Sequence, residues 1–253
     1  MTKLTFLGTG TSQGVPMIGC GCDVCRSSDP RDKRLRASVL VEHEGLTILV
    51  DSGPDFRQQM LRDDVSHVDA ILLTHNHKDH TGGLDDIRAF NYHEKKASQI
   101  YCEKYVEDAL RMEYSYAFAE KKYPGAPEWD VHIIDEKPFS INGVEIIPIR
   151  GMHYKLPVLG YRFGKIAYCT DMNHIPEEEF AKLQGLDHFV INCVKYGKHI
   201  SHYSLEEAVA VAQRVGAKHS WLTHLSHRLP CYETLAAKLP AGILPAYDGM
   251  VLE

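Results

Sequence analysis

The 253-residue chain lacks long hydrophobic runs, internal repeats and low-complexity segments. No apolar stretch reaches the roughly 18 residues that a membrane-spanning helix needs, so a helical membrane protein is not expected. The first residues, MTKLTFLGTGTSQG, enter a strand pattern at once and lack the apolar core and cleavage site of a signal peptide. We therefore expect a cytoplasmic protein without a membrane partner.

Positive charge is also in short supply. The 28 Lys and Arg residues are outnumbered by 34 Asp and Glu residues, which gives a formal net charge of −6. This balance disfavours nucleic acid as a partner, because nucleic acids bind to basic faces. It still allows a small anionic substrate that is held by a few local cations or by a metal ion. The sequence leaves the oligomeric state open, with a homodimer among the choices.

Histidine and cysteine, by contrast, are well represented, with 15 and seven residues. In a reducing compartment a disulfide framework is not expected, so clustered cysteines are interpreted first as metal ligands. The excess of histidine calls for the same kind of explanation.

Short β-rich runs are interleaved with helical patterns along the chain. The β-rich runs cover residues 3–8, 37–43, 46–53, 70–75, 139–149, 159–171, 188–194 and 219–225. The helical patterns cover residues 103–118, 176–184, 204–215 and 231–239. Asn142-Gly143 predicts a two-residue hairpin turn, and Ser204 with Glu207 predicts a capping box. We expect one α/β domain over 1–253, with two sheets packed face to face and helices outside.

The densest motif is LLTHNHKDHTGG, residues 72–83, at the end of a buried strand. His75 and His77 alternate across a short turn and can converge on one cation, while Asp79 and His80 face a second point nearby. Imidazole and carboxylate ligands together suit zinc, manganese or iron(II) rather than calcium. The order and density of the motif favour a metal site over a loop of surface histidines.

Three further candidate ligands each follow an apolar strand. They are His153 in IPIRGMHYK, Asp171 in IAYCTDMN and His224 in SWLTHLSH. A single His or Asp at a strand end is usually a cap or a surface group. Three of them in the same arrangement favour a shared metal site.

The order T-H-x-H-x-D-H, then His, then Asp, then T-H resembles the metallo-β-lactamase superfamily of hydrolases. The resemblance covers essentially the whole chain and implies a four-layer αββα sandwich with two metals at one edge of the sheets. It also implies that one metal is held by His75, His77 and His153, the other by Asp79, His80 and His224, and that both are bridged by Asp171.

Such a metal pair indicates hydrolysis. Two divalent cations roughly 3.5–4 Å apart lower the pKa of a water molecule between them and stabilise charge on a phosphoryl or acyl group. Asp79 is a candidate catalytic residue that orients the resulting hydroxide. Manganese, zinc and iron all remain open as the catalytic metals.

A second cluster lies in GTGTSQGVPMIGCGCDVC, where Cys20, Cys22 and Cys25 form a C-x-C-x-x-C pattern. This spacing favours a structural zinc, and His227, three residues beyond His224, is the natural fourth ligand. The alternative is three unligated thiols. The remaining cysteines are scattered, and those in apolar strands are expected to be core residues.

The cysteine loop makes the resemblance more specific, because it points to one family within the superfamily. Together with GTGTSQGVP and LTHLSH it is similar to the phosphoribosyl cyclic-phosphate phosphodiesterase family of phosphonate degradation. That resemblance implies the same Cys3His zinc, and an additional active-site histidine at His202, a candidate general acid. The nearby His199 is the competing choice, and a surface role for His202 also remains open. A pyrroloquinoline-quinone biosynthesis family shares a related cysteine loop but lacks the full histidine set.

Two basic residues are candidates for binding substrate phosphate: Arg36, directly before a predicted strand, and Lys155, just after His153. The segment 91–130 is interpreted as either a lid or a helical arm. The leading hypothesis is a dinuclear-metal phosphodiesterase acting on a small phosphodiester, which could be cyclic. The alternatives are an RNA-processing ribonuclease, a non-catalytic metal-stabilised carrier, and, with least support, a flavo-diiron oxidoreductase.

Overall fold

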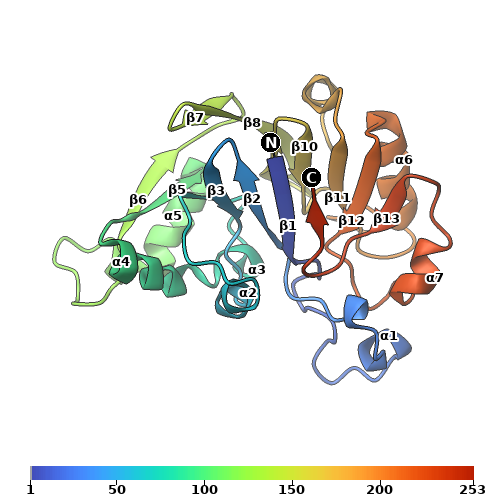
Figure 1. Cartoon of the computed structure of the whole chain (residues 1–253), viewed down its shortest axis with the longest axis horizontal. Coiled ribbons are helices and arrows are strands. Elements are labelled where there is room, and N and C mark those ends of the chain that lie inside the picture. Colours follow the sequence, from blue (N-terminus) through green and yellow to red (C-terminus); the bar gives the residue numbers. More distant parts are fainter. Residues whose placement is uncertain (1) are drawn as a thin grey trace.

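The computed structural model describes residues 2–253, which form two sheets packed face to face with helices on both outer faces (Figure 1). The first sheet has the strand order β14-β1-β2-β3-β4-β5-β6. Its strands are β1 Thr2–Gly8, β2 Ser38–His43, β3 Leu46–Val50, β4 Ala70–Leu72, β5 Ser98–Cys102, β6 Trp129–Ile133 and β14 Val251–Leu252. This sheet therefore combines the N-terminal half of the chain with the last strand.

The second sheet is built from the C-terminal half, in the order β13-β12-β11-β10-β9-β8-β7. Its strands are β7 Phe139–Ile141, β8 Val144–His153, β9 Leu156–Phe163, β10 Ile166–Cys169, β11 His188–Asn192, β12 His219–Thr223 and β13 Ile243–Pro245. The pairs β10–β11, β11–β12 and β12–β13 are parallel, whereas β7, β8 and β9 form antiparallel hairpins.

Alternation along the strands explains the layers. In β1, Phe6 points into the core between the sheets, and the next residue, Leu7, points into the core under the helices of the first sheet. Helices α2 (Phe56–Arg62), α4 (Arg88–Glu94) and α5 (Lys104–Glu113) cover that outer face. The second sheet is covered by α6 (Leu205–Val215), α7 (Tyr232–Ala236) and η4 (Glu177–Leu183). The four-layer αββα sandwich predicted from the sequence is thus confirmed.

The short helices lie in the loops between these elements. They are α1 (Asp23–Arg26), η1 (Pro30–Asp32), α3 (Lys78–Thr81), η2 (Leu84–Ile87) and η3 (Ser115–Ala117). Within residues 2–253, no helix combines the length and the apolar character that crossing a membrane would require.

Local sequence patterns correctly predicted a hairpin turn and a helix cap. Asn142 and Gly143 both have positive φ and join β7 to β8, as the hairpin prediction requires. The Ser204 side chain accepts from the Glu207 N–H and the Glu207 side chain accepts from the Ser204 N–H, which confirms the capping box. The helix ends at Gly216, which adopts the left-handed conformation.

Two predicted segments differ in the structure. The run 159–171 is not continuous, because Gly164, with φ +55, turns the chain between β9 and β10. The segment 91–130 is not merely a helical arm, since it contributes β5 and β6 to the first sheet, on either side of α5. β6 is an edge strand with half-buried and exposed residues, so it lacks the apolar pattern of a central strand.

Candidate metal centre

The strand directions bring the predicted ligands to one edge of the sandwich. β8, β10 and β12 run the same way, because β9 is antiparallel to both β8 and β10 while β10, β11 and β12 are parallel. Their carboxyl ends therefore meet at one edge, where His153 ends β8, Asp171 follows β10 and His224 follows β12. In the first sheet, the LLTHNHKDHTGG motif follows β4 and forms α3.

Asp171 lies at the centre of this cluster. Its Oδ1 is 2.9 Å from His224 Nε2, and its Oδ2 is 3.7 Å from His75 Nε2 and in contact with His80 Nε2. Asp79 Oδ2 lies 3.3 Å from His80 Nε2 and 3.7 Å from His224 Nε2. Ligand atoms of Asp79, His80, Asp171 and His224 all lie within 4.8 Å of one another, as a shared cation requires.

The other three histidines form a neighbouring group. The ring centroids of His75 and His77 are 4.6 Å apart, those of His77 and His153 are 5.0 Å apart, and those of His75 and His153 are 5.7 Å apart. Asp171 faces this group through the same Oδ2 that approaches His75. The side chains that the sequence analysis assigned to two metals are thus brought together on both sides of one carboxylate.

The buried carboxylates and histidines of the cluster strongly shift one another's pKa values. Burial alone would lower the pKa values of His80 and His224, but Asp171 and Asp79 raise that of His80 well above its usual range and that of His224 to about 9. Burial would raise the pKa of Asp171, but His224 and His80 hold it well below its usual range. The buried carboxylates therefore demand positive charge, which protons on the imidazoles provide when no cation does.

The donor set fits divalent metals. Nε2 of His75, His80 and His224, and Oδ1 of Asp171, are buried, and the contacts among these groups lack the geometry of hydrogen bonds within residues 2–253. Buried polar atoms without partners are costly, so this many in one place indicates that something else binds them. A mixture of imidazole nitrogen and carboxylate oxygen suits zinc, manganese or iron.

The sequence analysis missed Asp51, a buried carboxylate behind the ligands. Asp51 Oδ2 lies 2.6 Å from His80 Nδ1, so it fixes the orientation of a ring whose Nε2 faces the cluster. The Thr74 N–H and hydroxyl both donate to Asp51. The only sequence signal for Asp51 is its position directly after the apolar strand LTILV.

Close backbone approach explains the glycines around the motif. A Cβ on Gly53 would meet the Asp79 carbonyl oxygen at 2.1 Å, and a Cβ on Gly83 would meet the Gly53 carbonyl oxygen at 2.1 Å. The loop after β3 can therefore pack directly against the segment that carries Asp79. Gly83 serves this contact rather than a positive φ, since it does not adopt one.

His202 lies beside the cluster, and His199 lies farther out. His202 Nδ1 is 3.4 Å from Asp171 Oδ1, and its ring centroid is 4.5 Å from that of His153 and 4.7 Å from that of His224. Burial and His224 lower the pKa of His202 to about 3, so it is neutral in the free protein. The His199 ring is 5.1 Å from that of His202, and its Nδ1 accepts from the Ser201 N–H.

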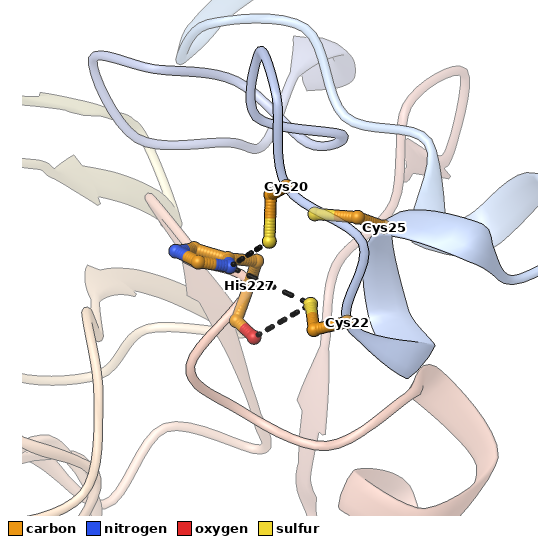
Figure 2. Close-up of side chains that lie close together, drawn as sticks. All are labelled: Cys20, Cys22, Cys25 and His227. Carbon is orange, nitrogen blue, oxygen red and sulfur yellow. Dashed lines mark hydrogen bonds between the residues drawn. The ribbon is translucent and has the colours of Figure 1, made fainter.

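The cysteine loop and His227 meet in a second cluster. Figure 2 shows the side chains of Cys20 and Cys22 pointing at the His227 ring, with Cys25 beside them. Cys20 Sγ is 3.2 Å and Cys22 Sγ is 3.5 Å from His227 Nδ1, and the four side chains form a group that could hold a metal ion. Hydrogen bonds from the Cys25 backbone and from His227 lower the pKa of Cys22 to about 6.

The two basic candidates differ in their surroundings. The Arg36 guanidinium is engaged by Asp55 Oδ1 at 2.8 Å and by the Ser12 carbonyl at 3.0 Å. Lys155 has no ion-pair partner among residues 2–253 and lines a cleft of about 500 Å³ together with the candidate ligands His77 and His153. Lys155 is therefore the freer of the two side chains.

The fold and site define the class of the protein. Residues 47–225 match the beta-lactamase superfamily domain, so the chain belongs to that superfamily. The chain also aligns with the crystal structure of a diphosphatase from the PhnP family, at 39% identity and a TM-score of 0.93, over 99% of this chain and 96% of that chain. The protein is a PhnP-family metallo-hydrolase with a His/Asp metal cluster.

The chain is also similar to three further proteins. Zinc-bound PqqB from Methylobacterium extorquens aligns at 18% identity with a TM-score of 0.81, over 99% of both chains. An octanoyltransferase of Porphyromonas gingivalis is 42% identical over 251 residues, which is 98% of this chain and 51% of that protein. Coenzyme PQQ synthesis protein B of Methylococcus capsulatus is 28% identical over 156 residues, covering 56% of this chain and 50% of that protein. The chain thus spans about half the length of these two curated relatives.

Proposed function

We propose that this protein is a dinuclear-metal phosphodiesterase that hydrolyses a small phosphodiester, with diphosphate diesters in the same substrate class. The observation that carries the proposal is Asp171, a buried carboxylate whose Oδ1 approaches His224 and whose Oδ2 approaches both His80 and His75, so that it touches candidate ligands of both metals. The 39% identical relative named as a diphosphatase supports phosphorus as the reaction centre. Both linkages present the same reacting group, a phosphoryl centre with one ester or anhydride bond to break.

In this proposal, the metals are held by His75, His77, Asp79, His80, His153, Asp171 and His224, and a structural zinc by Cys20, Cys22, Cys25 and His227. When bound, two divalent cations lower the pKa of water and stabilise developing oxyanion charge. Asp79, whose Oδ2 already approaches two ligand histidines, orients the attacking group. Lys155 and Arg36 bind substrate phosphate, with Lys155 the stronger candidate because it has no competing carboxylate.

His202 is proposed as the general acid for the leaving group. A general acid must carry a proton, and an anionic phosphate beside His202 favours its imidazolium form, since nearby negative charge raises the pKa of an imidazole. This requirement couples protonation of the acid to substrate binding. When a diphosphate diester is hydrolysed, the leaving group is a phosphate, which needs less protonation by a general acid than an alkoxide does.

Two alternative functions have less support. A carrier without catalysis would resemble the quinone-biosynthesis relatives, but their identity to this chain, 28% over 56% of it and 18% for zinc-bound PqqB, is lower than the 39% of the diphosphatase. An RNA-processing ribonuclease is disfavoured by the net charge of −6. Octanoyl transfer is not part of the proposal, because the relative with that name is matched over only 51% of its length.

The test is turnover by purified, metal-loaded protein. We expect hydrolysis of bis(p-nitrophenyl) phosphate with added Mn²⁺, followed by activity on members of a panel of cyclic, linear and diphosphate diesters. Asp171→Ala should abolish hydrolysis and lower the metal content, because this carboxylate serves both cations. A variant that keeps near-normal turnover and two bound metals would contradict the site assignment, and a wild type inactive on the whole panel would favour a carrier.

A further inference from the structure

The cleft beside the metal ligands has a mainly apolar wall. It has a volume of about 500 Å³, within the range of small-molecule sites. Tyr154 and Ile200 lie on its wall with 52% and 66% of their surfaces exposed, which is unusual for large apolar side chains next to a polar centre. The full lining consists of His77, His153, Tyr154, Lys155, Leu156, Ile200 and Ser201.

The backbones of Tyr154 and Ile200 are both hydrogen-bonded to one side-chain amide, that of Asn173. Tyr154 has φ +58, a conformation that is rare for a bulky residue and persists only where the surroundings enforce it. Its N–H donates to Asn173 Oδ1 at 2.8 Å, and Asn173 Nδ2 donates to the Ile200 carbonyl at 3.2 Å. Asn173 lies two residues after Asp171, so the wall of the cleft is tied directly to the metal-binding loop.

We infer that this cleft binds a planar aromatic group of the substrate, such as a nucleobase, which stacks on the Tyr154 ring while the attached phosphodiester lies at the metal ligands. The inference rests on the proposed function and specifies its substrate class. An aromatic face and an aliphatic side chain suit a flat apolar group, whereas a bare sugar needs several hydrogen-bonding partners. The cleft offers only a few of these, from Lys155, Ser201 and the Tyr154 hydroxyl.

Charge in the cleft fits a nucleotide-like ligand. The Lys155 ammonium lies over one face of the Tyr154 ring, 5.4 Å from its centroid, so a cation is available at the stacking residue while the other face of the ring would receive the aromatic group. Two candidate metal ligands, His77 and His153, belong to the same lining, so the reacting end of the ligand would lie at these histidines. An aromatic group joined to phosphate through a short linker satisfies both ends at once.

The first experiment compares two substrates with the same leaving group, thymidine 5′-(p-nitrophenyl phosphate) and methyl p-nitrophenyl phosphate. We expect the wild type to prefer the nucleoside ester in kcat/KM. Stacking of one base is worth about 1–3 kcal/mol, so Tyr154→Ala should reduce that preference by about 5- to 150-fold. Tyr154→Phe should retain it, and Tyr123→Ala, at an exposed tyrosine outside the lining, should leave it unchanged.

The second experiment needs no turnover. Calorimetry on the metal-loaded protein should show that adenosine 5′-monophosphate binds more tightly than ribose 5-phosphate, and that Tyr154→Ala removes this difference with its metal content intact. If the wild type hydrolyses neither ester but prefers the nucleotide, the proposed function fails and the cleft assignment stands. Equal losses on both ligands in Tyr154→Ala, or an unchanged preference, would overturn the inference.

Discussion

Three residues at the metal edge share a backbone conformation that most side chains avoid. Asp51, Asp171 and His224 have φ values of +63, +55 and +54, and each lies within two residues of the end of a strand. The left-handed turn ends the extended run and aims the side chain across the edge of the sheets. For a residue such as histidine this conformation is uncommon, and its presence at all three positions indicates that ligand placement outweighs local strain.

Asp51 gives the sharpest test of this arrangement. Asp51→Asn keeps the shape of the side chain and tolerates the positive φ, because asparagine adopts the left-handed conformation as readily as aspartate does. The amide cannot accept from both Thr74 and His80 as the carboxylate does, so the His80 ring loses its fixed orientation. We expect metal affinity or activity to fall about 10- to 100-fold.

Metal affinity is measured by competition with a chromophoric chelator, and activity with the metal-saturated protein. Asp130→Asn, at a carboxylate whose side chain is 58% exposed, is the matched control and should change neither quantity. If Asp51→Asn binds metal as the wild type does and remains fully active, the His80 contact has no role in the site.

His202 is tested by the chemistry of the leaving group. His202→Ala should keep its metals but slow substrates with alkoxide leaving groups by about 10²–10⁴-fold, because such groups need a proton as they depart. Esters of p-nitrophenol should be affected much less, since p-nitrophenolate leaves without protonation. Equal losses on both would assign His202 to substrate positioning, and a selective loss only in His199→Ala would move the acid to that residue.

At the scale of elements, we expect the cysteine loop to depend on a metal ion of its own. α1 and the segment around it are anchored at the second sheet through the group of Cys20, Cys22, Cys25 and His227 (Figures 1 and 2). The low pKa of Cys22 makes its thiolate available as a ligand near neutral pH. Zinc bound there would order the loop.

Cys22→Ser should therefore lose one zinc per chain and unfold at a lower temperature, while the His/Asp cluster keeps its metals. Cys231→Ser is the matched control, because Cys231 packs against the same small cluster of buried residues but lies outside the Cys3His group. Metal analysis and thermal denaturation of both variants provide the readout. An unchanged zinc content in Cys22→Ser would exclude a zinc site in the loop.

The clustering of the candidate ligands could be predicted because they follow strands with clear apolar runs. His153, Asp171 and His224 each end such a run, and their residue types limit the chemistry. Asp51 also ends one, but it belongs to no recognised motif, and its role arises only when β3 and β4 pair and place it behind His80. Tertiary pairing of this kind leaves no local trace in the sequence.

The last two strands on one side of the first sheet, β5 and the edge strand β6, were the least predictable part of the fold. β5 and β6 have mixed burial, and their pairing with each other and with β4 depends on the complete sheet rather than on their own residues. α5 was predictable from its amphipathic pattern, since Val106 and Leu110, four residues apart, both pack under the sheet. The periodicity of a helix can be seen in a single segment, whereas the burial pattern of a strand depends on the strands that pair with it.

On the scale of the whole molecule, the segment 246–250 joins the two sheets. It connects β13 in the second sheet to β14 in the first, with the Ala246 N–H donating to the Leu222 carbonyl and the Phe6 N–H donating to the Met250 carbonyl. Asp248 anchors it by accepting from the Thr9 hydroxyl and the Leu35 N–H, both at 2.7 Å. The C-terminal segment thereby also fixes the loop that follows β1.

This anchor predicts a pH-dependent stability. Burial raises the pKa of Asp248 to about 6, although Leu35, Thr9, Arg34 and Arg62 all lower it. Between about pH 4 and pH 6 the folded protein therefore keeps a proton on Asp248 that the unfolded chain has released. The stabilisation from this tighter proton binding is complete below pH 4 and is lost as the pH rises through 6. The interval between the two pKa values corresponds to about 3 kcal/mol.

Asp248→Asn cannot titrate, so its free energy of unfolding relative to the wild type should improve by up to that amount between pH 4 and pH 7. Urea denaturation at several pH values measures the difference, and parallel pH profiles for the two proteins would show that Asp248 is not protonated in the folded state.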